Sequence, residues 1–151
     1  MRPILLLSAV TLAAGATAAA AQNPPPAPAP TVQPQRSGIR LADVAGSWEG
    51  KSMVGPKDSV IVTYVMTATA DGKGWTITFP GRDPLPTRIV ATGGDSIVTE
   101  TGPYASVVRP GQMVTTRTTS HYKGDTATGT FEAHYASGDV LRGKVVATRK
   151  K

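Results

Sequence analysis

The sequence contains no cysteine and only two histidines among its 151 residues, and aromatic residues make up 5% of it. The lack of cysteine excludes a disulfide framework, a zinc ribbon, an iron–sulfur cluster and a thiol nucleophile. Two histidines leave little material for a histidine-based metal centre. The composition therefore predicts no metal site, and we expect no cofactor.

A large excess of charge is also lacking in the part of the chain that can fold. The whole chain has a formal net charge of +6, but residues 38–148 contain eleven basic and ten acidic residues, a net charge of +1. Part of the excess lies in the last three residues, Arg149, Lys150 and Lys151. A nucleic-acid-binding face needs clustered basic residues interleaved with aromatic ones. Because no such cluster is found, we expect no nucleic-acid partner.

Residues 1–21 have the pattern of a signal peptide. Arg2 precedes an apolar run over residues 4–14, and small residues continue to Ala21. The run is too short for a transmembrane helix, and its small-residue end resembles a cleavage site. We expect cleavage near Ala21, export to the periplasm or the medium, and no stable membrane insertion afterwards. The alternative interpretation is an N-terminal membrane anchor.

Residues 22–37 are predicted to be a Pro/Ala-rich linker. The stretch 22–35 contains six of the thirteen prolines and almost no residue able to pack in a core. Proline fixes φ and removes a hydrogen-bond donor, so such a segment favours an extended spacer. The folded domain is then expected over residues 38–151.

In residues 38–151, strand patterns alternate with turn signals, and no stretch shows a helical period beyond a short turn at 41–44. Short loops between successive strands indicate an up-and-down meander, and eight such strands can close into a barrel. The sequence therefore predicts an all-β, eight-stranded antiparallel barrel with no long helix. The expected strands are 46–54, 59–70, 74–80, 86–92, 95–108 (bent at 102–103), 112–123, 126–136 and 140–149.

Turn chemistry predicts the register of three hairpins and hence the inward faces. A two-residue turn at Asp71-Gly72 places Met66 opposite Ile77, and a two-residue turn at Gly124-Asp125 places Thr115 opposite His134. A three-residue turn at 137–139 places Lys144 beside Glu132 on the outer face. The resulting inner face contains these candidate ligand-binding residues: Tyr64, Met66, Trp75, Ile77, Phe79, Thr116, Thr118, Phe131 and Tyr135.

Gly46-Ser47-Trp48 at the start of the first predicted strand, with Arg149 at the end of the last, resembles the calycin superfamily and its lipocalin-like domains. The resemblance implies that Gly46 makes a turn, that Trp48 closes one end of the barrel, and that Arg149 packs across the tryptophan ring as a cation–π contact. These three residues are therefore expected to have a structural role. The chain departs from most lipocalins in its shorter length and its lack of cysteine.

Residues 94–97, Gly-Asp-Ser-Ile, superficially match the nucleophile block of GDSL esterases. Those enzymes also need a downstream Asp-x-x-His, and neither His121 nor His134 has an acidic residue three positions before it. The two histidines are expected on the outer face about 20 Å apart, too far to share a metal. We expect no enzymatic activity. Asp95, Ser96 and a histidine within hydrogen-bond reach would count against this expectation.

The predicted inner face mixes bulky residues with small and hydroxylated ones, which leaves two functional hypotheses open. In the first, an exported, non-catalytic protein binds a small, largely apolar or amphipathic molecule inside the barrel. In the second, the barrel is filled and acts as an interaction or structural module through its outer face or through the loop 80–86. An interior void below about 100 Å³ would count against the first hypothesis. The oligomeric state is not predicted.

Overall fold

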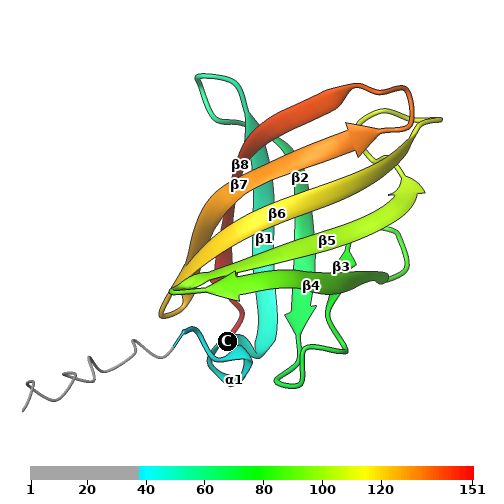
Figure 1. Cartoon of the computed structure of the whole chain (residues 1–151). Coiled ribbons are helices and arrows are strands. Elements are labelled where there is room, and N and C mark those ends of the chain that lie inside the picture. Colours follow the sequence, from blue (N-terminus) through cyan, green and yellow to red (C-terminus); the bar gives the residue numbers. More distant parts are fainter. Residues whose placement is uncertain (1–37) are drawn as a thin grey trace, which may run out of the picture. The chain divides into compact units, whose positions relative to one another are not determined.

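The computed structural model describes residues 38–151, so the predicted signal peptide (1–21) and linker (22–37) lie outside the described residues. Within 38–151, no helix is long and apolar enough to cross a membrane. The described part of the chain forms one short helix and eight strands (Figure 1): α1 (Leu41–Val44), β1 (Gly46–Val54), β2 (Ser59–Ala68), β3 (Thr76–Thr78), β4 (Leu85–Gly93), β5 (Ser96–Ala105), β6 (Met113–Lys123), β7 (Thr126–Tyr135) and β8 (Val140–Arg149).

The strands form a closed antiparallel barrel in sequence order, in which β8 also pairs with β1. This arrangement confirms the predicted fold class. Closure gives most strands a neighbour on both sides, so few backbone donors and acceptors are left at a sheet edge. The bend expected at 102–103 is present as a register shift between Thr101 and Tyr104 where β5 pairs with β6.

Two of the three predicted registers are correct. Met66 lies opposite Ile77 in the β2–β3 pair, and Thr115 lies opposite His134 in the β6–β7 pair. Alternation along these strands therefore assigned their inward faces correctly.

The third register is wrong by two positions. Glu132 lies opposite Arg142 rather than beside Lys144. The three-residue turn spans 136–138 instead of 137–139, and its last residue is a glycine with φ of 95°. A glycine at that position of a three-residue hairpin loop supplies the left-handed conformation that the turn needs. A shift by two positions leaves the inward face unchanged and alters only the cross-strand neighbours.

The third strand is shorter than expected, with three residues rather than the predicted span 74–80. Hydrogen bonds to Asp71 explain why this strand begins two residues later than predicted. The Asp71 carboxylate accepts hydrogen bonds from the Thr69 hydroxyl at 2.6 Å and from the Lys73 backbone N–H at 2.9 Å. These contacts stabilise a loop over 69–75, because side-chain acceptors here replace the partners that a strand ladder would provide.

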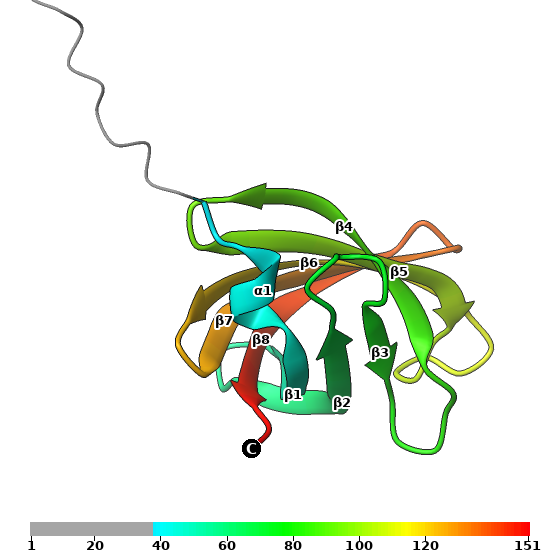
Figure 2. The ribbon, with the colours of Figure 1, turned by 90° about the horizontal axis from the view of Figure 1, so that it is seen from below.

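The barrel has two unlike ends. We call the end covered by α1 the closed end (Figure 2), and the end formed by the loops 55–58, 79–84, 106–112 and 136–139 the loop end. The core cluster at the closed end includes the three most deeply buried large side chains, Trp48, Trp75 and Ile97. A second cluster lies toward the loop end and contains Val114, Phe131, Ala133, Tyr135 and Val145.

Candidate ligand-binding site

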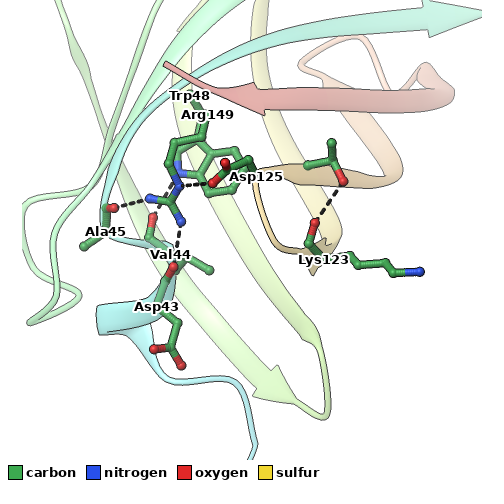
Figure 3. Close-up of polar contacts among 8 residues, drawn as sticks. Asp43, Val44, Ala45, Trp48, Lys123, Asp125 and Arg149 are labelled. Carbon is green, nitrogen blue, oxygen red and sulfur yellow. Dashed lines mark hydrogen bonds and ion pairs between the residues drawn. The ribbon is translucent and has the colours of Figure 1, made fainter. Parts of the chain in front are cut away.

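Arg149 fixes the closed end of the barrel (Figure 3). Its guanidinium carbon lies 4.4 Å from the centroid of the Trp48 ring. The same group donates hydrogen bonds to the carbonyl oxygen of Asp43 at 2.6 Å, to the carbonyl of Ala45, and to the carboxylate of Asp125 at 3.0 Å. The contact expected between Arg149 and Trp48 is thus present, and it ties the last strand to the segment that precedes the first.

Trp48 is fully enclosed beneath this contact. Its indole N–H donates to the carbonyl oxygen of Val44 at 2.9 Å, and its ring meets Tyr122 edge to face with centroids 5.3 Å apart. Gly46 adopts φ of 129°, a conformation that residues with a side chain rarely adopt. Buried side chains thus fill the barrel interior at the closed end.

The interior cavity lies in the half of the barrel toward the loop end, and its volume is about 50 Å³. Seven of the nine candidate ligand-binding residues contribute to its wall: Tyr64, Ile77, Phe79, Thr116, Thr118, Phe131 and Tyr135. The wall contains no charged side chain and no histidine. Most of the candidate residues therefore line the cavity, although they are fewer than half of its nineteen wall residues. The cavity is also smaller than ligand pockets usually are.

Met66 and Trp75 do not line the cavity, in contrast to the expectation from the sequence. Both belong to the core cluster at the closed end, where Trp75 is 1% exposed. The Trp75 indole N–H donates to the carbonyl oxygen of Thr69 at 2.9 Å. Alternation along a strand gives the face of a residue but not its level along the barrel axis, which explains the error.

Several residues of the wall are not among those predicted from the sequence. Ser52 on β1 and Thr101 and Tyr104 on β5 line the cavity, as do residues of the loop 106–112. Ser52 shares the face of Trp48, so alternation from Trp48 would have found it. Tyr104 follows the register shift after Thr101 in β5. Such a bulge reverses the alternation of inward and outward residues, so alternation counted from the start of β5 places Tyr104 on the wrong face.

Three aromatic rings close a gap in the barrel wall. Because β3 ends at Thr78, no residue of β3 pairs with the part of β2 before Val65. The rings of Tyr64 and Phe79 lie 6.5 Å apart there, and Phe79 lies 5.5 Å from Tyr104. Side-chain packing thus replaces backbone pairing along this part of the cavity.

Arg82 holds this aromatic row in place from outside. Its guanidinium donates to the carbonyl oxygens of Ala105 and Ser106, which follow Tyr104 in the chain. The loop 79–84 is therefore fastened to the end of β5, and Phe79 at its start stays against Tyr104.

Hydroxyl groups provide the polarity of the cavity wall, and several of them bond to one another. The Thr87 and Thr101 hydroxyl oxygens are 2.7 Å apart, and the Tyr104 and Thr116 hydroxyl oxygens are 2.9 Å apart. Burial raises the pKa of the Tyr104 hydroxyl above its ordinary value, and burial likewise raises the pKa of Tyr64. Both phenols therefore stay protonated and can act as hydrogen-bond donors.

Outside the barrel, His121 and Asp95 form a pair near the turn between β4 and β5. The His121 Nδ1 atom lies 3.0 Å from a carboxylate oxygen of Asp95, and this contact lowers the pKa of Asp95. Ser96 lies opposite His121 in the sheet, but its hydroxyl donates to the carbonyl oxygen of Gly93 at 2.7 Å. Two of the three groups expected of a catalytic set are thus in contact, and the serine hydroxyl is bound to the backbone.

His134 is the other histidine, and it lies 3.4 Å from Glu132 on the exposed surface. Within residues 38–151, no three potential ligands come together as a metal site would require.

A surface groove lies on the outer face, beside the gap after β3. It has a volume of about 710 Å³ and is much larger than the interior cavity. Residues of β1, β2 and the segment 78–83 line it, among them Lys51, Thr63 and Arg82. Part of the loop 80–86, which the second functional hypothesis names as an interaction surface, therefore lines this groove.

Comparison of the chain with protein-family models, with curated protein sequences and with solved structures gives no significant match. The geometry of the barrel is therefore the basis for the function proposed below.

Proposed function

We propose that this chain is an exported, non-catalytic binding protein that takes a slim, largely apolar molecule into the loop end of its barrel. The observation that supports this proposal is the interior cavity, whose wall is mainly aliphatic and aromatic and has no charged residue. Burial of apolar ligand surface there supplies affinity, and the wall hydroxyls supply orientation. The proposed relationship to the calycins is supported by the Trp48–Arg149 contact and the closed eight-stranded meander.

The volume of the cavity sets what such a ligand can be. A volume of about 50 Å³ is below the limit of about 100 Å³ under which an interior void counts against the first hypothesis, so the proposal is narrowed to a ligand that enters the barrel only in part. In this conformation only a narrow group, such as the end of an alkyl chain, fits inside. The rest of the molecule would lie at the loop end.

Exposed apolar side chains at the loop end suit this partial insertion. Among residues 38–151, four of the five large hydrophobic residues that are exposed flank or belong to its loops, namely Val60, Val108, Met113 and Val140. Val108 also lines the cavity, so the apolar wall continues to the surface. A ligand that extends beyond the cavity would bury part of this surface.

An amide-resolved NMR titration of the full chain with hexane tests the proposal. We expect saturable shifts at Thr116, Thr118 and Phe131, and we expect Ala133→Val to abolish them because the added methyl groups fill the cavity. Thr130→Val is the matched control, since Thr130 is exposed on the same strand. The absence of any shift at saturating hexane would overturn the proposal.

The second candidate function is an interaction module whose outer groove binds a protein segment. The observation in its favour is the size of that groove compared with the small interior cavity. Hexane shifts confined to Thr63, Thr78 and Arg82, together with an unperturbed interior, would favour this candidate. The second candidate would also be favoured if Arg82→Ala lost binding to a protein partner while Ala133→Val kept it.

A further inference from the structure

Four hydroxyl groups on the cavity wall have no protein partner. No hydrogen bond connects the side-chain hydroxyls of Ser52, Tyr64, Thr118 or Tyr135 to any other atom of residues 38–151, although all four residues line the cavity. Every fully enclosed polar side-chain atom in that part of the chain is hydrogen-bonded. These four hydroxyls therefore border accessible space, and the cavity is the space whose wall includes all four residues. Tyr64 also borders the outer groove.

The chain makes room for one of these groups in particular. Tyr64 lies opposite Gly50, and a Cβ atom at Gly50 would collide with the Tyr64 ring. Gly50 therefore lets the phenol lie along the inner face of β1. Tyr64 keeps some accessible surface although burial raises the pKa of its hydroxyl well above the usual range, as expected for a ring on a cavity wall.

The unpaired hydroxyls come from different walls of the cavity. Ser52 and Tyr64 belong to the adjacent strands β1 and β2. Thr118 and Tyr135 belong to β6 and β7, and β6 is four strands from β2 in either direction around the barrel. By contrast, the hydroxyls of Tyr104 and Thr116, also on the cavity wall, already bond to each other. The hydroxyls without a protein partner thus border one cavity.

We infer that the group inserted into the cavity carries a neutral carbonyl oxygen, which accepts a hydrogen bond from the Tyr64 hydroxyl. A buried hydroxyl without a partner is unfavourable, so a ligand acceptor there gains a hydrogen bond that the free protein lacks. An anionic acceptor is disfavoured because no cationic side chain lines the wall. The ligand class is therefore a slim ketone, aldehyde or ester, and this inference rests on the proposed function.

The inference is tested with two matched probes, methyl pentyl ketone and the alkene in which a methylene group replaces the carbonyl oxygen. Both are titrated into the full chain, the Tyr64→Phe variant and the Tyr104→Phe variant by amide-resolved NMR. Tyr64→Phe should weaken ketone binding about fivefold to tenfold and leave alkene binding within about twofold, which is the size of one hydrogen bond. Tyr104→Phe should change the affinities of the two probes by the same factor.

Equal effects of Tyr64→Phe on the affinities of the two probes would overturn the inference. The proposed function would stay in place, because the cavity would then bind apolar groups while water occupies its hydroxyls. A ketone preference that survives Tyr64→Phe would also overturn it. Failure of both probes and of hexane to bind the unaltered chain would overturn the inference and the proposed function together.

Discussion

The two halves of this barrel share eight strands but differ in how completely they are packed. At the closed end Trp48, Trp75 and Ile97 are at most 1% exposed, and both indole N–H groups are hydrogen-bonded to backbone carbonyls. Toward the loop end the wall encloses a cavity, and unpaired hydroxyls border it. The comparison teaches that the closed end is packed to maintain the fold, and the loop end is the half in which we propose that a ligand binds.

The difference has a local cause in the sequence. At the closed end, Arg149 and α1 cover the ring of Trp48. The Arg149 guanidinium also donates a hydrogen bond to the carbonyl oxygen of Asp43, in the segment before β1. Toward the loop end, the early end of β3 removes backbone pairing from part of the wall, and aromatic rings take its place. Side-chain packing adapts to a ligand more readily than a hydrogen-bonded ladder does.

The largest expected effect is that of Trp48→Ala. Removal of this buried ring should lower the free energy of unfolding by about 3–5 kcal/mol, because a large cavity remains at the centre of the closed-end cluster. Chemical denaturation of the full chain measures this change. A loss below about 1 kcal/mol, within the ordinary range of surface substitutions, would show that the closed end does not hold the fold.

Arg149→Met should come next, with a loss of about 2 kcal/mol in the free energy of unfolding. The substitution keeps an apolar stem but removes the cation–π contact and the hydrogen bonds to Asp43, Ala45 and Asp125. Arg142→Met is the matched control, since Arg142 makes an exposed ion pair with Glu132. Equal small losses in the two variants would contradict the closing role assigned to Arg149.

A finer comparison lies within the cavity wall. Tyr104→Phe removes the hydrogen bond to Thr116 and should cost about 1 kcal/mol in stability. Tyr64→Phe removes a hydroxyl that has no protein partner, so the same measurement should give a change close to zero. A large loss for Tyr64→Phe would mean that its hydroxyl is bonded within the protein, which would undermine the ligand assignment.

The smallest expected effect concerns acid stability at the outer surface. The hydrogen bond to His121 lowers the pKa of Asp95, so this pair stabilises the folded state above the ordinary pKa of an aspartate, and the stabilisation is lost as the pH falls through the lowered value. Asp95→Asn should therefore reduce the fall in stability below about pH 4. Asp83→Asn, in the exposed loop 79–84, is the control. An unchanged acid slope in Asp95→Asn would contradict this assignment.

The sequence was sufficient for the architecture because period-two alternation and short turns restrict a chain of this length to few arrangements. Gly124-Asp125 defined the β6–β7 register correctly, since a two-residue turn leaves one pairing. The β7–β8 turn was misplaced by one residue, because Ser137 and Gly138 fit two neighbouring three-residue turns. The inward faces were still correct, since both placements preserve the parity of the strand.

The candidate site was less predictable, because its position along the barrel axis depends on packing. Alternation placed Met66 and Trp75 on the same face as Tyr64, but only the folded chain shows that they lie in the closed-end cluster. The bulge in β5 concealed Tyr104 for a similar reason. The volume of the cavity is also a property of packing and could not be derived from residue types.

The indole N–H signals of Trp48 and Trp75 allow one direct test of the division between the two halves. Both groups are buried at the closed end and bonded to backbone oxygens. In a titration of the full chain with methyl pentyl ketone, the account predicts saturable amide shifts at Tyr64 and Thr118 and no change in either indole signal. Indole shifts as large as those of the cavity wall, or no shift at the wall, would contradict it.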